Sequence, residues 1–432
     1  MRKVKQTLFL GLVIVLVMGF ALPGCAPKAA PAEKTTPPPP AVPIKIGIVL
    51  PMTGANAKFG EMERDSIMIA YNKFGVKEIG GRPINFIIED ERGDPSIAKS
   101  AVEKLVGVDN VDLIVGGYSS ACTVTIAAAA NDLAVPLIIT TGSKDDITMA
   151  GYQWVFSGPR VPASHYADAM WDFLDKVFVP GGVKTVALYY EMTDWGTSSA
   201  KALRPKFEKR GIKLVYDSPY DSKATDFKPM LSKVKAANPD MIMAVSYLTD
   251  AGLLARQAAE LRVNVKAYMG QAGGYTMPEF LELAGDNVNY IFTTTNWSPV
   301  VAWKGELAGV KWINKEYYDA YVATYKAEPD YHGSQAFAGW QVALDALLRA
   351  NATGKPINRE NIKEVLKGTK LMTTLGLIEH KEWTDEMGHH YYNQSLPPTY
   401  VIQWLKKAQQ VVWPLAGKSG DYVFPVPKYE ER

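Results

Sequence analysis

Short apolar runs alternate with longer amphipathic segments along most of the chain. The run IKIGIVL at 44–50 is apolar on both faces, which is typical of a strand buried inside a sheet. A glycine turn and an amphipathic helix follow within 53–75, and apolar runs within 82–95, 111–117 and 135–141 predict three further strands. Strands that alternate with helices indicate βαβ crossovers and a parallel sheet covered on both faces.

Two more helices are predicted between these strands. One covers 96–110 and has Ser96 as a suitable N-cap, and the other runs from Ser119 to Asn131. The sequence therefore predicts a complete α/β unit in its first third.

The same alternation starts again after residue 182 and predicts a second α/β unit. Its strands are expected at 183–190, 213–220, 240–247 and 265–274, with helices at 198–212, 228–239 and 249–261. Helical patterns at 316–327 and 334–350 are expected to pack back on the first unit. The segment 399–414 predicts a strand, a turn and a strand.

The beginning of the chain has a different pattern. Basic residues precede an apolar run at 7–21, which is shorter than the ~20 residues of a membrane-spanning helix. The motif LPGC then resembles the bacterial lipoprotein signal box, apart from Pro23. We expect a signal peptide at 1–24, lipidation of Cys25 and a stiff Pro- and Ala-rich tether at 25–43. The alternative is a cysteine that merely lies in a signal peptide or a short membrane anchor.

Charge and cysteine content exclude other classes of protein. The 47 Lys and Arg residues nearly balance the 45 Asp and Glu residues, which argues against a nucleic-acid partner. Two cysteines in 432 residues do not form a disulfide framework.

Two strand-end turns carry small hydroxyl residues. GGYSS at 116–120 follows the third predicted strand, and TTGS at 140–143 follows the fourth. Ligands of open parallel sheets bind outside the carboxyl ends of the strands, and a helix N-terminus offers free N–H groups to an anion. These turns therefore predict a binding site for a carboxylate. Ser and Thr are also common helix N-caps, so a purely structural role remains the alternative.

Catalytic and metal-binding motifs are missing from the sequence. It contains no GxxxxGK[ST], GxGxxG, HExxH, GxSxG or CxxC motif. His389 and His390 lie in a polar, aromatic loop, where a surface role is expected rather than a catalytic metal site. Cys122 lies in an Ala-rich helix and is expected to be a buried, inert thiol. We expect no catalytic residue, metal or cofactor.

An ordered set of segments resembles the branched-chain amino-acid family of type I periplasmic binding proteins, which serve ABC importers. The segments are IKIGIVLPMTGANAKFG, GGRPINFIIEDERGDPSIAKSAVEKLV, IVGGYSSACT, VPLIITTGSKDDIT, WVFSGPR and VVWP, in family order from about Ile44 to Pro414. The resemblance implies two doubly wound, parallel-sheet α/β lobes that are joined by three hinge crossings and close over a solute.

Domain limits follow from the same resemblance. Lobe 1 is expected to comprise 44–160 and 297–378, lobe 2 to comprise 161–296 and 379–414, and 415–432 to form a C-terminal tail.

Candidate ligand-binding residues are carried over position by position. In amino-acid binders of the family, the two first-lobe turns hold the α-carboxylate and part of the α-ammonium, and aromatic side chains cover the solute. The matching residues are Phe59, Tyr118, Ser119, Ser120, Thr141, Gly142, Ser143, Trp195 and Tyr247.

Two positions depart from the family pattern. Ala272 stands where branched-chain amino-acid binders carry an acid that pairs with the ammonium, so either Asp194, Asp250 or another acid replaces it, or the ligand lacks an α-ammonium. Gly93 falls at a cysteine position of the first-lobe disulfide that some members have, and Cys122 has no partner.

The resemblance implies an exported, lipid-anchored solute-binding protein of an ABC transporter rather than an enzyme. It is expected to take an amino acid or a related small carboxylate and to deliver it to permease subunits. The alternative is a ligand-sensing module for a small amide or for an aromatic or aliphatic carboxylate, which feeds a signalling partner.

Overall fold

The structure, a computed structural model, describes residues 41–432, which form one compact unit. The predicted signal peptide, Cys25 and most of the predicted tether lie outside the described residues. Within 41–432, no helix is both long enough and apolar enough to cross a membrane.

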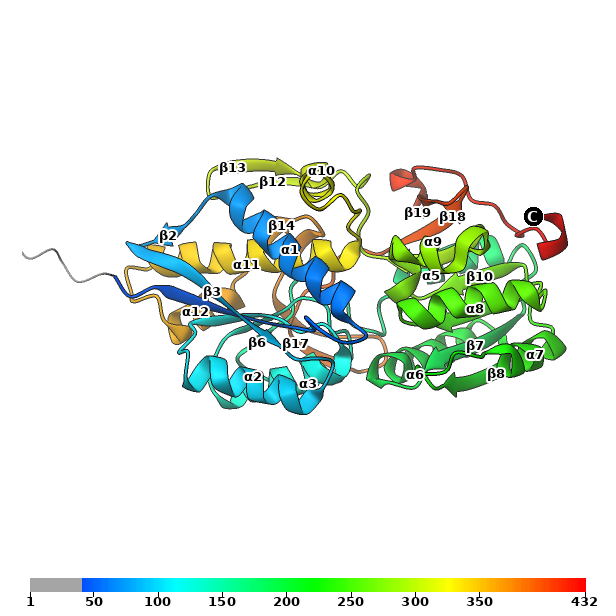
Figure 1. Ribbon diagram of the computed structural model, residues 1–432, viewed down its shortest axis with the longest axis horizontal. Coiled ribbons are helices and arrows are strands. Elements are labelled where there is room, and N and C mark those ends of the chain that lie inside the picture. The colour runs from blue at the N-terminus through cyan, green and yellow to red at the C-terminus, as the bar shows by residue number, and fades with distance from the viewer. Residues whose placement is uncertain (1–40) are drawn as a thin grey trace, which may run out of the picture. The chain divides into compact units, whose positions relative to one another are not determined.

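The first lobe is built on a six-stranded sheet with the order β2-β3-β1-β4-β5-β6 (Figure 1). All pairs are parallel except β2–β3. The strands are β1 (Ile44–Leu50), β2 (Glu78–Ile79), β3 (Arg82–Asp90), β4 (Leu113–Gly116), β5 (Leu137–Ile139) and β6 (Val155–Phe156).

Helices cover both faces of this sheet, as the sequence predicts for a parallel sheet. Helices α1 (Ala57–Phe74) and α11 (Tyr331–Ala352) lie on one face, and α2 (Pro95–Gly107) and α3 (Ser120–Asp132) lie on the other (Figure 1). Leu113 and Val115 pack toward α1 and α11, whereas Ile114 between them packs toward α2 and α3. The strand period of two therefore divides the core into two layers.

The N-cap of α2 is Asp94 and not Ser96, so that prediction is wrong. The Asp94 carboxylate accepts hydrogen bonds from the backbone N–H groups of Ser96 and Ile97 and from the Ser96 hydroxyl. Pro95 occupies the first helical position, where its missing N–H costs nothing, and this shifts the helix start by one residue.

The second lobe is built on a seven-stranded sheet with the order β19-β18-β11-β10-β9-β7-β8. Its strands are β7 (Thr185–Glu191), β8 (Lys213–Tyr220), β9 (Met241–Val245), β10 (Ala267–Gly270), β11 (Ile291–Thr295), β18 (Tyr400–Leu405) and β19 (Ala408–Trp413). The last two are antiparallel, and the others run parallel.

Alternate residues of β7 again face two different layers. Leu188 packs with residues of α5 (Asp168–Phe173) and α6 (Asp194–Lys209). Tyr189 packs with residues of α7 (Lys228–Ala237), α8 (Leu248–Glu260) and α9 (Glu279–Ala284). The second sheet is therefore also covered on both faces.

Later segments complete both lobes. Helices α10 (Asn314–Tyr325) and α11 join the core of the first lobe, as predicted. Residues 422–426 contact the second lobe: Phe424 packs on Phe178, and the Val426 N–H donates to the Lys266 carbonyl. The remaining short elements are α4 (Asp146–Met149), α12 (Arg359–Lys367) and the hairpins β12–β13 (Lys304–Leu307, Val310–Ile313), β14–β15 (Lys370–Thr373, Gly376–Glu379) and β16–β17 (Lys381–Thr384, His390–Gln394).

The chain passes between the two lobes three times, at 157–167, 296–303 and 395–399. The first and third crossings are held together, because the Ser395 N–H donates to the Ser157 carbonyl at 3.0 Å and the Ala169 N–H donates to the Thr399 hydroxyl at 3.0 Å. This confirms the predicted fold of two parallel-sheet lobes with three crossings. The predicted domain limits stay a prediction; β17, which lies beyond 378, contacts α4 and β6 of the first lobe.

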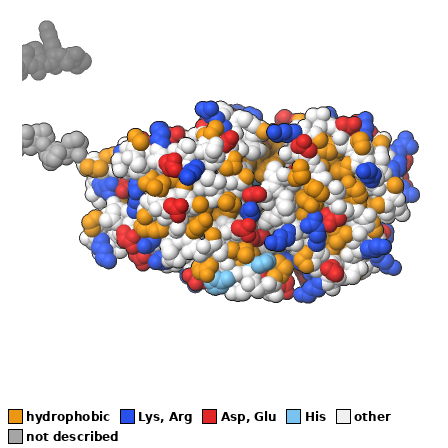
Figure 2. Space-filling model, turned by 90° about the horizontal axis from the view of Figure 1, so that it is seen from below, with side chains coloured by type: hydrophobic (Ala, Val, Ile, Leu, Met, Phe, Trp, Pro, Cys, Tyr) orange, Lys and Arg blue, Asp and Glu red, His pale blue; other side chains and the backbone are white. Residues whose placement is uncertain are grey.

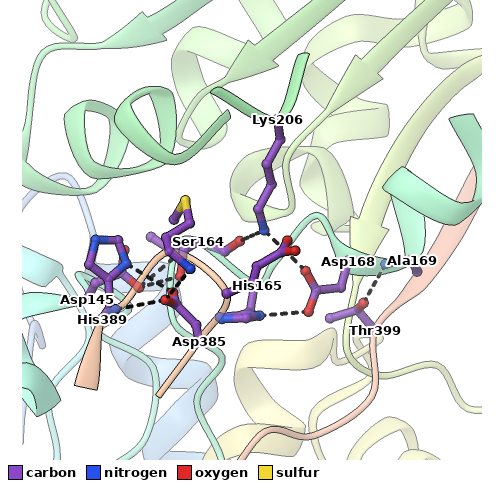
Figure 3. Close-up of polar contacts among 12 residues, drawn as sticks. Asp145, Ser164, His165, Asp168, Ala169, Lys206, Asp385, His389 and Thr399 are labelled. Atoms are coloured by element: carbon purple, nitrogen blue, oxygen red, sulfur yellow. Dashed lines mark hydrogen bonds and ion pairs between the residues drawn. The ribbon is translucent and has the colours of Figure 1, made fainter. Parts of the chain in front are cut away.

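A polar network surrounds the first crossing (Figure 3). The Lys206 ammonium of α6 donates to the Ser164 carbonyl and pairs with Asp168, which also holds the His165 ring. The Ser164 hydroxyl donates to the buried Asp145 of the first lobe at 2.7 Å. The crossing is thus tied to both lobes by side chains.

Charges of both signs are mixed on the face drawn in Figure 2. This mixture agrees with the net charge of +2.

Candidate functional site

A small pocket lies between the strand ends of the two lobes. Its volume is about 20 Å³, which is roughly room for one water molecule. The first lobe contributes the turns after β4 and β5 and the start of α11, and the second contributes the start of α6 and the turns after β9 and β10. The lining residues are Tyr118, Ser120, Thr141, Ser143, Tyr166, Trp195, Tyr247, Gly273, Tyr331 and His332.

The two serines of the first turn have different roles. Ser119 is the N-cap of α3, and its hydroxyl accepts a hydrogen bond from the Cys122 N–H. Ser119 therefore has the structural role of a helix cap. The buried Ser120 hydroxyl lines the pocket and accepts from the N–H groups of Ser143 and Lys144 at 3.2 and 3.1 Å. Because its oxygen is occupied as an acceptor, the Ser120 hydroxyl has its proton left to donate.

The turn after β5 is held from behind by a buried arginine. Arg160 donates to the carbonyls of Gly142 and Lys144, both at 2.9 Å. Gly142 does not line the pocket; a side chain there would meet Thr123 of α3 at 2.1 Å. The Thr141 hydroxyl donates to the Gln335 amide oxygen at 3.0 Å, so it is occupied as a donor.

Several donors of the first lobe have no partner among the described residues. The Ser120 and Ala121 N–H groups lie in the first turn of α3, where intrahelical acceptors are missing. The Tyr118 hydroxyl is buried without a partner, and the Ser143 hydroxyl has none either. Together with the positive end of α3, these groups can receive an anionic oxygen.

Aromatic side chains from both lobes meet at the pocket. Phe59 does not line it but stacks on Tyr118, with ring centroids 4.7 Å apart and an interplanar angle of 22°. In the second lobe, Trp195 packs on Tyr247 at 4.9 Å. Tyr118 and Tyr247 lie 6.3 Å apart, so the two aromatic groups touch across the lobes.

The start of α6 places Trp195. Glu191, at the end of β7, is buried, and its carboxylate accepts from the Gly196 N–H at 2.7 Å and from the Thr193 hydroxyl at 2.6 Å. Burial raises the pKa of Glu191. The hydrogen bonds of Glu191 hold the first turn of α6 in place, and this turn carries Trp195.

Ala272 does not line the pocket, but the next residue does. Gly273 has φ +55°, and a side chain there would meet Trp195 at 2.4 Å and the Ser246 carbonyl at 2.6 Å. Its N–H donates to the Tyr331 hydroxyl at 3.1 Å. Glycine is therefore required by both the backbone conformation and the close approach of the indole.

Neither Asp194 nor Asp250 lines the pocket. Asp194 pairs with Lys144 at 3.1 Å. Asp250 is buried and accepts from the Tyr220 hydroxyl at 2.5 Å, and burial raises its pKa to about 7. Among residues 41–432, the lining contains no Asp, Glu, Lys or Arg.

Four lining residues were not predicted from the sequence. Gly273 was overlooked beside Ala272, and Tyr166 lies in the irregular first crossing, which has no periodic pattern. Tyr331 and His332 begin α11, which starts three residues earlier than the expected 334. The residue that marks this earlier helix start in the sequence is Asp330, a typical N-cap residue. Its carboxylate accepts a hydrogen bond from the His332 N–H at 2.8 Å.

A buried acid lies behind the second turn. Glu63 of α1 is fully buried and accepts from the Thr140 hydroxyl at 2.5 Å, and its other oxygen has no partner among the described residues. Burial raises the pKa of Glu63 to about 8, so the carboxyl is protonated near pH 7.

A larger cavity of about 350 Å³ involves the same two lobes. Its lining includes the Lys144–Asp194 pair and His389. His389 bonds Asp385 at 3.0 Å (Figure 3), and within 41–432 no cluster of three or more potential metal ligands occurs. Cys122 is buried in α3, and burial raises the pKa of its thiol well above the ordinary value.

Comparison with known proteins agrees with this geometry. A family model described as periplasmic binding protein matches residues 43–408. The Leu/Ile/Val-binding protein homolog 7 of Brucella suis is 25% identical over 342 residues, which is 78% of this chain and 81% of that protein.

Solved structures show the same fold. A leucine-binding protein of Thermotoga maritima has a TM-score of 0.72 and 24% identity and covers 85% of this chain and 97% of its own. The branched-chain amino-acid binding protein of Streptococcus pneumoniae, in complex with isoleucine, has a TM-score of 0.71 and 22% identity with the same coverage. A solute-binding protein of Rhodopseudomonas palustris in complex with 3,4-dihydroxybenzoic acid has a TM-score of 0.70 and 19% identity, covering 89% of this chain and 98% of its own. The chain therefore belongs to the periplasmic binding protein family, and its two lobes have the fold of the branched-chain amino-acid substrate-binding proteins.

Proposed function

We propose that the chain is the solute-binding protein of an ABC transporter and captures a small carboxylate with an apolar or aromatic body. The observation that carries this proposal is the composition of the pocket lining. It combines hydroxyl donors and aromatic rings, and in the described part of the chain it includes no Asp or Glu.

The first lobe would hold the carboxylate. Tyr118, Ser120 and Ser143, whose hydroxyls can donate, line the pocket, and the first N–H groups of α3 lie in the turn that carries Ser120. Hydrogen bonds to a charged acceptor each contribute about 1.5–3 kcal/mol, so a few of them suffice without a buried lysine.

The second lobe would cover the body of the solute. Trp195 and Tyr247 supply apolar area and exclude water as the lobes close. Related folds hold isoleucine and 3,4-dihydroxybenzoic acid, so both aliphatic and aromatic bodies fit this architecture.

An α-ammonium is not favoured in this pocket. A buried ammonium requires an acid or several acceptors, and its desolvation otherwise costs several kcal/mol. Ala272 stands at the position where the acid is expected, and Asp194 and Asp250 are engaged elsewhere. We therefore infer a carboxylate without an ammonium.

Identification of the solute that co-purifies with the protein is the first test. Mass spectrometry should find a carboxylic acid, and calorimetry should give tighter binding of 3-phenylpropanoate or 4-methylpentanoate than of phenylalanine or leucine. Tight binding of the amino acids alone would overturn the ligand class.

The Ser120→Ala variant tests the proposed carboxylate-binding site of the first lobe. It should weaken carboxylate binding roughly 10- to 100-fold through the loss of a charge-assisted hydrogen bond. Ser100→Ala, an exposed serine of α2, is the matched control. Equal affinities of the two variants would show that Ser120 does not bind the carboxylate.

We further propose export, anchoring through a lipid on Cys25 and delivery to permease subunits. The short apolar run before LPGC and the Pro-rich segment after it support the anchor. Cys25→Ser should release the protein from the membrane fraction or leave the signal uncleaved. Normal cleavage with unchanged membrane retention would disprove lipidation at Cys25.

A further inference from the structure

His332 is the one lining residue of the pocket, tyrosines aside, that can carry a charge among residues 41–432. It is the second residue of α11 and is 2% exposed. Its ring lies 4.8 Å from the Phe59 ring and 5.6 Å from the Tyr118 ring. The protonation state of His332 therefore decides which charge a solute meets in the pocket.

Asp330 fixes the orientation of this ring. One carboxylate oxygen lies 2.8 Å from His332 Nδ1 and also accepts from the Thr276 hydroxyl of the second lobe at 2.9 Å. The other oxygen accepts from the His332 backbone N–H. Because Nδ1 faces Asp330, Nε2 is the nitrogen left for a solute, and it has no partner within the described chain.

Asp330 and the His332 ring form a buried pair. Asp330 is 4% exposed, and His332 is its one ion-pair partner in residues 41–432. The Asp330 carboxylate also accepts from the His332 N–H and the Thr276 hydroxyl, and a cation beside it would balance its charge in this aromatic environment. A protonated ring donates through both nitrogens: Nδ1–H to Asp330 and Nε2–H into the pocket.

We propose that His332, positioned by Asp330 and held as an imidazolium, is a specificity-determining residue that donates from Nε2–H to the anionic group of the solute. It selects a singly charged carboxylate over a zwitterionic amino acid, because the imidazolium attracts the carboxylate and repels an ammonium. This assignment rests on the proposed carboxylate-binding function and explains how the site works without the acid expected at Ala272.

Other titratable groups near His332 are uncharged at neutral pH. Burial raises the pKa values of Tyr118, Tyr247 and Tyr331 well above the ordinary value for tyrosine, and that of Tyr166 is raised as well. Glu63, behind the second turn, has a pKa of about 8 and becomes negative only above that pH. Ionisation of Glu63 adds a negative charge behind the second turn and weakens anion binding as pH rises.

The test compares His332→Gln with His390→Gln, an exposed histidine on β17, in the full chain. Calorimetry with 3-phenylpropanoate and with phenylalanine is run at pH 7. His332→Gln should lose roughly 10- to 100-fold in affinity for 3-phenylpropanoate, with little loss for phenylalanine.

Unchanged 3-phenylpropanoate affinity in His332→Gln would overturn the inference. So would a selective loss of phenylalanine binding, because a neutral Nε2 would then be accepting from the ammonium.

A second readout does not need a solute. Nitrogen NMR of histidine-labelled protein, assigned by the signal lost in His332→Gln, should show both ring nitrogens of His332 protonated at pH 7, and Asp330→Asn should abolish this signature. A neutral ring in the wild-type protein disproves the inference even if carboxylates bind. Failure of every carboxylate to bind, with the imidazolium present, would instead contradict the proposed function.

Discussion

At the scale of single residues, buried acids are the main surprise of this molecule. Glu63, Glu191 and Asp250 all lie at or near strand ends that border the pocket, and none of them lines it. Each is hydrogen-bonded by a neighbouring hydroxyl, and burial raises the pKa of each. They hold turns and helix starts in place and become protonated where an exposed acid would be ionised.

Glu63→Gln should flatten the pH dependence of stability. The native state binds the Glu63 proton up to about pH 8, whereas the ordinary pKa of a glutamate side chain is 4.5. The contribution to the unfolding free energy is therefore complete below about pH 4.5 and is lost as pH rises toward 8, with a slope of at most about 1.4 kcal/mol per pH unit.

Urea unfolding of the wild type and the variant between pH 5 and 8 measures this slope. Glu61→Gln, an exposed acid on the same helix, is the control and should follow the wild type. Parallel curves for the wild type and Glu63→Gln would show that Glu63 does not hold its proton.

At the scale of elements, strand-and-helix alternation was enough to predict the parallel units. Buried strands such as β9 (Met241–Val245) and helices such as α7 stand out in the sequence, because apolar periodicity records burial directly. The first crossing and the hairpins β12–β17 were not predicted, because they are short and obtain their order from tertiary contacts.

The candidate site was predicted only in part, for the same reason. Ser120, Thr141 and Trp195 are adjacent to strong strand signals and line the pocket. Tyr166 lies in the irregular first crossing, where no local pattern marks it, and the only local mark of His332 is the N-cap residue Asp330. Ser119, Gly142, Phe59 and Ala272 lie next to lining residues, and their part in ligand binding stays a prediction.

The turn after β10 should be intolerant of any side chain. Gly273→Ala places a methyl group within 2.4 Å of the Trp195 ring at φ +55°, so the indole must move and solute affinity should fall. Gly211→Ala has a similar φ of +69° with open space around it, and it isolates the backbone strain of about 1–2 kcal/mol.

Thermal unfolding and calorimetry separate these two effects. Both variants should lose stability, but only Gly273→Ala should lose affinity for the co-purified solute. Equal affinity in both would show that the place of Trp195 does not matter for binding.

At the scale of the whole molecule, few polar contacts join the lobes at the pocket. The Thr276 hydroxyl reaches Asp330, the Gly273 N–H reaches Tyr331, and Lys144 pairs with Asp194. Each pairs a residue of one lobe with a residue of the other, so they exist only when the lobes are together.

A bound solute should compact and stabilise the protein. At a hundredfold excess over Kd, the gain in unfolding free energy should be about 2.7 kcal/mol. Thr276→Val removes one joining hydrogen bond at nearly constant shape and should make the solute dissociate faster. Small-angle scattering that shows no compaction by a solute proven to bind would contradict closure of the lobes.

The small pocket volume has a consequence for the speed of capture. Binding cavities for small molecules usually measure about 300–1,000 Å³, whereas here Trp195, Tyr247 and their neighbours leave about 20 Å³. The protein's own side chains thus compete with the solute for the same space, and admission must wait until the lobes part. In rapid-mixing experiments the observed association rate should level off at high solute concentration, at a ceiling set by this opening step and independent of the solute used.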